Sequence, residues 1–142
     1  TLLLELRPSA LVDAELRDLL RQLGESITGR ARVPVSVEVA GECALPEDAK
    51  VAFYRIAQES LNNVAKHANA TEAAVRLRCR RDRVELCVRD DGAGFDLDTV
   101  PPDSLGLGIM RERAQAIGAA LTIDSEVGQG TEVRMTWERP EE

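Results

Sequence analysis

The chain has 142 residues, of which 44% are hydrophobic and 30% are charged, a composition that suits one globular domain with a sizeable core. Its formal net charge of -7 argues against general nucleic-acid binding, because proteins of that class neutralise phosphates with an excess of Lys and Arg. No apolar run reaches the ~20 residues of a membrane span and no signal peptide is visible, so we expect a domain that contacts neither nucleic acid nor membrane.

The three cysteines are Cys43, Cys79 and Cys87, an odd number without a CxxC pair. They predict neither a disulfide framework nor a zinc site, and they favour a reducing compartment. We expect a cytoplasmic domain, whether or not the parent protein is anchored in a membrane. The chain begins without Met and in the middle of an apolar pattern, which is typical of a piece of a longer protein.

Two helical segments are predicted at the start of the chain. Residues 1–11 are typical of the end of an apolar helix that breaks near Pro8, where the backbone hydrogen-bond ladder is interrupted. Residues 12–27 repeat leucine at helical spacing, and we expect Gly24 or Gly29 to end this helix.

A strand and a long helix follow. Alternating valines over residues 33–39 predict a half-buried strand, and Pro34 places it at a sheet edge or at the start of the strand. Residues 46–69 predict the central helix. Its first turn contains Glu47 and Asp48, whose charges suit the positive end of the helix dipole.

Four polar side chains share one side of this predicted helix. Glu59, Asn63, Lys66 and His67 are spaced i, i+4, i+7 and i+8, and they fall within a sector of roughly 100°. Apolar residues gather on the opposite side, except Ile56, which lies near the polar stripe. Because asparagine is disfavoured inside helices, the stripe indicates a site, and a solvated surface helix is the alternative.

Residues 71–80 and 83–90 predict a β-hairpin with a tight turn. If residues 79 and 84 pair, alternate side chains fall on opposite faces of the sheet. Cys79 and Cys87 then point to opposite faces, so no disulfide joins these two. One face carries a row of arginines, which either dock a partner or, more commonly, are simply solvated. The row consists of Arg76, Arg78, Arg80 and Arg89.

The second strand of the hairpin ends in DDGAGFD, residues 90–96. Asp-Gly is common in tight turns, so a simple turn is one interpretation. A calcium loop is excluded, because the oxygen ligands at alternating positions and the closing glutamate are absent. In a nucleotide-binding loop, Asp90 would present an acceptor carboxylate into a cleft, and Gly92 and Gly94 would let the backbone approach a flat ring.

The last segments are a loop, a helix and two strands. Residues 98–105 contain two prolines and little periodicity, which indicates a loop able to close over a ligand. Gly106 and Gly108 open a helix whose free N–H groups suit phosphate. There is no GK[ST], and Arg111 stands at the third glycine position of a dinucleotide fingerprint, so neither of those motifs is present. Residues 120–138 predict two alternating strands.

Four motifs in this order are more specific than any one of them: RIAQESLNNVAKHANA, DDGAGFD, GLGIMRERA and a Gly-Thr pair entering the last strand. Together they resemble the catalytic and ATP-binding domain of sensor histidine kinases, in the superfamily shared with DNA gyrase, Hsp90 and MutL. The resemblance covers about residues 33–138 and is greatest to the nitrate and nitrite sensors and DegS-like kinases. LLLELRPSAL resembles the segment that follows their second dimerisation helix. We therefore expect residues 1–11 to be a remnant of that segment and residues 12–142 to form the catalytic domain.

The resemblance implies a fold and an ATP site. The fold is a two-layer α/β sandwich of the GHKL or Bergerat type, with a mixed sheet covered by helices on one face and ATP between the helical layer and a lid. Asp90 matches the carboxylate that accepts the adenine amino group, and Thr131 matches a hydroxyl beside it. Asn63 matches the residue that holds Mg²⁺. Glu59 matches the acidic residue that orients or activates a water near the metal or the γ-phosphate.

The other site residues follow from the same resemblance. Lys66 and His67 match positions near the phosphates, where cationic or donor groups suit a transferring phosphoryl group. Gly92 and Gly94 match residues that make room for the base. The lid hinge and its phosphate contacts correspond to Gly106, Leu107 and Gly108.

The resemblance also implies partners. The only histidine, His67, lies on the nucleotide-site helix, so the phosphoacceptor histidine is expected on a dimerisation domain of the same protein, outside this chain. A response regulator would receive the phosphoryl group on an aspartate, and the parent protein would be a homodimer. The alternatives are a gyrase- or MutL-type ATPase, an anti-sigma-type serine kinase, and a nucleotide-sensing module without catalysis.

Overall fold

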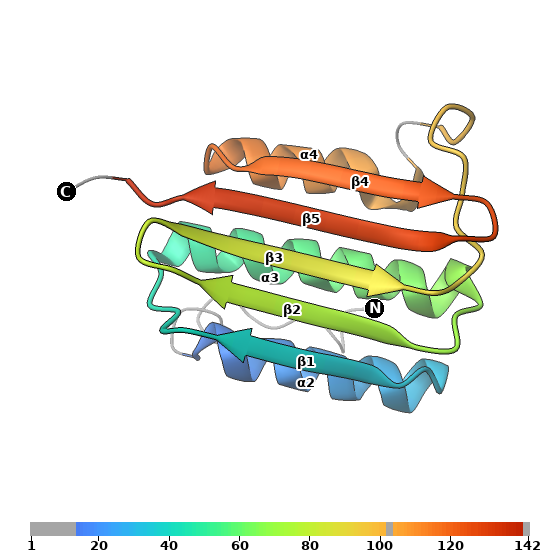
Figure 1. Cartoon of the computed structure of the whole chain (residues 1–142), viewed down its shortest axis with the longest axis horizontal. Helices are drawn as coiled ribbons and strands as arrows, with labels where there is room; N and C mark the ends of the chain where they lie inside the picture. The colour runs from blue at the N-terminus through green and yellow to red at the C-terminus, as the bar shows by residue number, and fades with distance from the viewer. Residues whose placement is uncertain (1–13, 102–103, 141–142) are drawn as a thin grey trace.

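A mixed five-stranded sheet with three helices on one face makes up the described residues, 14–101 and 104–140, of this computed structural model (Figure 1). The helical elements are α2 (Leu16–Ala31), α3 (Glu47–Asn63), the π-helical turn η2 (Val64–Ala68), the 3-10 turn η3 (Ser104–Gly106) and α4 (Leu107–Ala116). The strands are β1 (Val35–Ala40), β2 (Ala73–Cys79), β3 (Arg83–Asp90), β4 (Ala120–Glu126) and β5 (Gly130–Glu138). The predicted two-layer sandwich is confirmed.

The sheet has the strand order β1-β2-β3-β5-β4. β1 is parallel to β2, and the other neighbouring pairs are antiparallel. β1 lies at an edge, in agreement with the proline at position 34, which has no N–H for a second neighbour. Cys79 pairs with Val84 in the β2–β3 hairpin, so the predicted register is confirmed.

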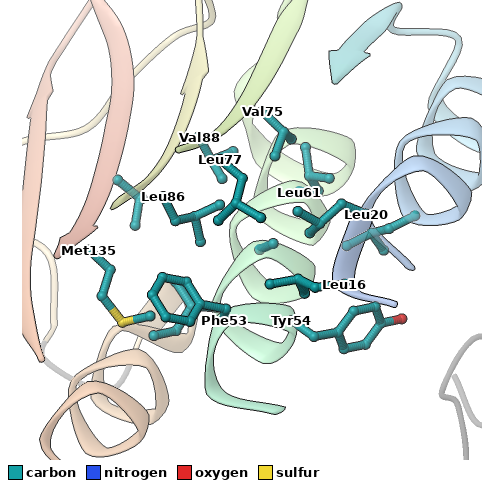
Figure 2. Close-up of a cluster of buried hydrophobic side chains, with 14 of the residues drawn as sticks. Leu16, Leu20, Phe53, Tyr54, Leu61, Val75, Leu77, Leu86, Val88 and Met135 are labelled. Carbon is teal, nitrogen blue, oxygen red and sulfur yellow. The ribbon is translucent and has the colours of Figure 1, made fainter. Parts of the chain in front are cut away.

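The core lies between the sheet and the helical layer (Figure 2). It joins α2 and α3 to the inner face of the strands, and each such side chain that is withdrawn from water stabilises the fold by about 1.5–3 kcal/mol. The buried side chains that meet there include Leu16, Leu20, Phe53, Leu61, Val75, Leu77, Leu86, Val88 and Met135. This packing fixes α3 against the centre of the sheet.

One helix prediction was wrong in detail. α2 continues past Gly24 and Gly29 to Ala31, because Gly24 is buried against β1, where an added Cβ would lie 3.0 Å from Cγ2 of Val37. That glycine therefore permits close packing and does not end the helix. Ile56, the one apolar residue that lies near the polar stripe, is fully buried, because α3 packs on the sheet and on both neighbouring helices.

Some predictions fall outside the described part of the chain. The broken helix over residues 1–11 is one of them, and residues 102–103 within the predicted loop are another. Among residues 14–101 and 104–140, no helix combines the length and apolar character needed to cross a membrane.

A disulfide between Cys43 and Cys79 joins the connection that precedes α3 to the end of β2. The two Cα atoms are 5.3 Å apart, although the residues are 36 positions apart in the chain. The prediction that the cysteines form no disulfide framework was therefore wrong. Strand parity places Cys79 on the helical side of the sheet, where this connection passes. Cys87 is free and lies on the open face, as the parity predicted.

Arg139 binds the same connection from the other end of the chain. Its guanidinium donates to the carbonyl oxygens of Arg80 at 3.0 Å, Ala44 at 3.1 Å and Glu42 at 3.5 Å. One side chain thus joins the β2–β3 turn to the segment that contains Cys43. We call this part of the molecule, made of residues 41–46, the end of β2 and Arg139, the tethered end.

Candidate functional site

A cavity of ≈ 120 Å³ lies between α3, η2 and α4 on one side and β3, β4 and β5 on the other. The predicted site residues on its wall are Asn63, His67, Asp90, Gly94, Leu107 and Thr131. The wall also contains Ser60, Val88, Phe95, Leu105, Met110, Ile123 and Val133, which the sequence did not single out. Alternation placed Val88 on the same face as the other apolar residues of the hairpin, but it gave no sign of a cavity there. We call this region the cavity end.

The cavity is an apolar slot with polar groups at its rim. Val88, Val133 and Met110 are buried and provide apolar walls on the sheet and helix sides. Such walls suit a flat aromatic ring. Its volume of ≈ 120 Å³ is below the ~300–1,000 Å³ of pockets that enclose whole drug-sized ligands, so the slot suits a base and leaves the rest of a nucleotide outside.

Asp90 is the last residue of β3 and presents its carboxylate at this slot. The Gly92 N–H donates to its Oδ1 at 2.8 Å. Burial raises the pKa of Asp90, and hydrogen bonds from the backbone of Gly92 and Thr131 oppose that rise. A carboxylate that has lost part of its hydration gains from a ligand N–H. Asp90 is therefore suited to accept from a base.

Asp91, one residue further, is an anchor. Its carboxylate accepts from the Thr71 N–H at 2.8 Å, from the Glu72 N–H at 3.1 Å and from the Thr71 hydroxyl. These hydrogen bonds, the hydroxyl's first, lower the pKa of Asp91. They fix the chain directly after Asp90 to the start of β2, so the Asp90 side chain is presented from a held backbone.

The two glycines of the loop make different contacts, and their predicted function of making room for the base stays a prediction. Gly94 has φ +64°, and an added Cβ would lie 2.1 Å from the Glu126 carbonyl oxygen. It is required by close approach to the β4–β5 hairpin, although it also lines the cavity. Gly92 is buried and lies off the cavity wall, where its N–H orients Asp90.

Ser125 of β4 ties the loop to the hairpin behind the cavity wall. Its Oγ lies 2.9 Å from the Phe95 nitrogen, 3.2 Å from the Gly130 carbonyl oxygen and 2.8 Å from the Thr131 Oγ1. Sequence reasoning missed it, because serine in an alternating strand beside a glycine-rich turn has no distinguishing signal. It holds two cavity residues, Phe95 and Thr131.

The helix side of the site ends in a π turn. α3 stops at Asn63, and η2 carries the chain to Asn69, which has φ 50°. A π turn holds more residues than an α turn, so the side chains after Asn63 depart from the positions that a 3.6-residue period gives. His67 lines the cavity, whereas Lys66 is exposed and off its wall. The proximity of Lys66 to a phosphate stays a prediction.

The end of the loop before α4 lies against two predicted catalytic residues. The Asn63 Nδ2 donates to the Leu105 carbonyl oxygen at 2.6 Å. An added Cβ at Gly106 would lie 2.1 Å from the Glu59 Oε1, so Glu59 abuts this loop and is off the cavity wall. Leu105 and Gly106 have φ 62° and 66°. Gly108 is half-buried in the first turn of α4, also off the wall.

Residues 48–141 match the protein family described as histidine kinase-, DNA gyrase B-, and HSP90-like ATPase. The chain belongs to this ATPase family. The matched range contains α3 except its first residue, the DDGAGFD loop, α4 and the last hairpin, and so the whole cavity wall.

Relatives of this ATPase domain narrow its type. Sensor histidine kinase LiaS of Bacillus subtilis (strain 168) is 34% identical over 135 residues, which are 94% of this chain and 37% of LiaS. Sensor protein VraS of Staphylococcus aureus (strain COL) is 34% identical over 134 residues, covering 94% of this chain and 38% of VraS. The fold alone is shared with the histidine kinase domain from the Erythrobacter litoralis EL346 blue-light activated histidine kinase, with a TM-score of 0.70 at 24% identity, covering 92% of this chain and 67% of that one.

The chain is a catalytic, ATP-binding domain of the sensor histidine kinase type. It spans less than two fifths of the length of LiaS and VraS, at 37% and 38%. The expected fold, family and enzyme type are confirmed.

Proposed function

We propose that this domain binds Mg²⁺-ATP in the cavity and transfers the γ-phosphoryl group to a histidine on a dimerisation domain of its parent protein. The phosphoryl group then passes to an aspartate of a response regulator, and the parent works as a homodimer without contacting nucleic acid through this domain. The observation that carries the proposal is one apolar slot with Asp90 and Thr131 on its sheet side and Asn63 and His67 on its helix side.

The base would lie between the apolar walls with its amino group toward Asp90. Asp90 and Thr131 are cross-strand neighbours on β3 and β5, so a single ring edge reaches both. The phosphates would then extend toward the C-terminal end of α3. There His67 is exposed and can donate to a phosphate oxygen, and the adjacent Lys66 supplies positive charge to the same side.

Mg²⁺ fits the helix side of the cavity. Within the described ranges no three His, Cys, Asp or Glu side chains gather into a metal cluster, so a metal that needs a cage made only of protein ligands does not fit. Mg²⁺ keeps several waters and binds through one or two protein oxygens plus nucleotide phosphates. Asn63 would hold it through Oδ1, since Nδ2 is committed to Leu105. When bound, the ion would offset the negative charge of the phosphates.

The chain's own groups act mainly by positioning. Phosphoryl transfer needs alignment and charge stabilisation more than covalent chemistry from the protein. Glu59 lies one helical turn before Asn63 and would orient a water near the γ-phosphate once the loop at Gly106 moves away from it. His67 faces the nucleotide cavity, so we assign the phosphoacceptor function to a histidine of the dimerisation domain.

Isothermal titration with ADP and a non-hydrolysable ATP analogue, each with and without Mg²⁺, tests the nucleotide site. We expect binding that Mg²⁺ strengthens in the wild type, and loss of that Mg²⁺ effect in Asn63→Ala. Asn62→Ala is the matched control, because Asn62 accepts from Arg30 at 3.2 Å and lies off the cavity wall. A normal Mg²⁺ response in Asn63→Ala would remove the metal assignment. Folded wild type that binds neither nucleotide would favour a module without catalysis.

Phosphoryl transfer itself is tested by adding the parent protein's dimerisation domain and labelled ATP. We expect label on that domain, none when its phosphoacceptor histidine is replaced, and strongly reduced label with Asn63→Ala. Label on a serine of the added domain, or free phosphate alone, would instead support a serine kinase or an ATPase.

A further inference from the structure

Ser125 lies outside the cavity wall, yet it contacts two residues that form it. We propose that Ser125 is a positioning residue that commits the Thr131 hydroxyl as an acceptor and thereby makes the cavity select a purine with an exocyclic amino group over one with an exocyclic oxygen. The inference rests on the proposed nucleotide site and names what gives it base selectivity.

Only one assignment of donors and acceptors satisfies all three hydrogen bonds of the Ser125 hydroxyl. A serine hydroxyl has one proton to donate and two lone pairs that accept. The Phe95 N–H uses one lone pair at 2.9 Å, and the Gly130 carbonyl, which can only accept, takes the proton at 3.2 Å. The remaining contact, at 2.8 Å to the Thr131 Oγ1, is then made only if Thr131 donates. All three contacts are satisfied when the Thr131 proton points away from the cavity.

The sheet side of the cavity then presents acceptors only. Thr131 faces the cavity with its lone pairs, beside the carboxylate of Asp90 on the neighbouring strand. An exocyclic amino group offers two N–H donors to such a pair. An exocyclic oxygen at the same place would face two acceptors with no proton between them, and leaving buried polar groups unpaired is costly.

Removal of the Ser125 hydroxyl changes this balance without touching a ligand atom. The Thr131 hydroxyl then loses its acceptor, rotates, and can donate to an exocyclic oxygen. The selectivity should therefore fall even though Asp90 and Thr131 are unchanged. A serine that merely stabilised the hairpin would lower the affinity for both purines alike, so the ratio of affinities separates the two functions.

Titration with ADP and inosine diphosphate tests the inference, because these ligands differ at the exocyclic position and the adjacent ring nitrogen. We expect wild type to prefer ADP, and Ser125→Ala to reduce the ADP to inosine diphosphate affinity ratio by about tenfold, the value of about one hydrogen bond. Ser125→Thr keeps a hydroxyl and should restore most of the ratio. Ser36→Ala, an exposed serine of β1, should leave it unchanged.

Thr131→Val is the second variant, in case Ser125→Ala does not fold. It removes the acceptor itself, so the ratio should fall to a similar extent, and adding Ser125→Ala to it should produce no further fall. An unchanged ratio in either single variant overturns the inference while leaving the nucleotide site intact. Folded wild type that does not bind ADP overturns the proposed function, and the inference with it.

Discussion

The tethered end and the cavity end of the molecule are built on opposite principles. At the tethered end, backbone carbonyls are satisfied by Arg139, and a disulfide closes the connection before α3. At the cavity end, a half-buried carboxylate faces a hollow, and two consecutive residues, Leu105 and Gly106, have positive φ. The comparison indicates that stabilising cross-links lie away from the ligand, whereas a partly desolvated carboxylate and the strained backbone of Leu105 lie where a ligand can contact them.

Reduction of the disulfide should give the largest effect. It should lower the stability of the fold and leave nucleotide binding nearly unchanged. In the chain-entropy account, a cross-link between residues 36 positions apart stabilises a fold by about 3–4 kcal/mol. For a domain of this size we expect reduction to lower the melting temperature by roughly 10 °C. Nucleotide affinity should change by less than about threefold, since the bond is remote from the cavity. Calorimetry with and without a phosphine reductant measures the melting temperature, and titration with nucleotide measures the affinity.

Matched variants make this test specific. Protein carrying both Cys43→Ser and Cys79→Ser should melt low and ignore the reductant, whereas Cys87→Ser should behave as wild type. Thiol titration of the unreduced, unfolded protein should find only Cys87. Three free thiols, or a melting temperature indifferent to reductant in the wild type, would contradict the disulfide.

Asp90→Asn should give the next largest effect. We expect it to weaken nucleotide binding without lowering the stability of the fold. Loss of a charge-assisted hydrogen bond should weaken ADP binding by ~1.5–3 kcal/mol, roughly 10- to 150-fold. The pKa of Asp90 is raised above 3.8 by burial, so its stabilising contribution is present at low pH and is lost as pH rises through the folded pKa. At neutral pH the variant should therefore melt at the same temperature or higher. Weak binding together with a lower melting temperature would mean that Asp90 holds the fold.

Gly94→Ala compared with Gly128→Ala should show how tightly the cavity end is packed. Both glycines have positive φ, at 64° and 84°, so alanine is strained at both. Only at Gly94 does the added Cβ meet backbone, 2.1 Å from the Glu126 carbonyl oxygen, while nothing lies within 4 Å at Gly128. We expect Gly94→Ala to be less stable by about 1–3 kcal/mol, the usual cost of overpacking. Equal denaturant midpoints for the two variants would show that the β4–β5 hairpin shifts to accommodate the added Cβ at little cost in stability.

Asp91→Asn should produce the smallest effect, and one that depends on pH. The pKa of Asp91 is lowered below 3.8, so its contribution is present above that value and is lost as pH falls through the folded pKa. The variant should lose stability near neutral pH and show a flatter acid limb in a plot of stability against pH. Asp90→Asn should change the pH dependence of stability in the opposite direction. Parallel curves for the two variants would contradict the different functions assigned to Asp91, which holds the loop backbone, and Asp90, which faces the ligand.

The fold was largely predictable, because it depends on periodicity. Alternation gave the hairpin register at Cys79 and Val84, and motif order gave the family. The helix boundaries were less predictable. Gly24 has the signature of a helix end, but it serves as a packing contact, which only the distance to β1 reveals.

Site residues that belong to a sequence motif could be predicted. Site residues that act only through tertiary contacts could not. Asp90 and Asn63 were predicted from recognisable stretches of sequence, whereas Ser125 acts through a hydrogen-bond network that no local pattern encodes. The disulfide was missed for the same reason, since loop path and not spacing brings Cys43 to Cys79. The π turn placed Lys66 off the wall because the helical period itself changes there.

The strand order has a consequence for how the chain is made. β5 is the last strand in the sequence, yet it lies between β3 and β4 and pairs with both. On a ribosome, β3 emerges with one edge open, and β4 has no neighbour in the sheet until residues 130–138 leave the exit tunnel. An open edge of that kind can pair with other chains. This sheet is therefore completed only after β5 has been synthesised, and a chain that stops before β5 would present that edge permanently.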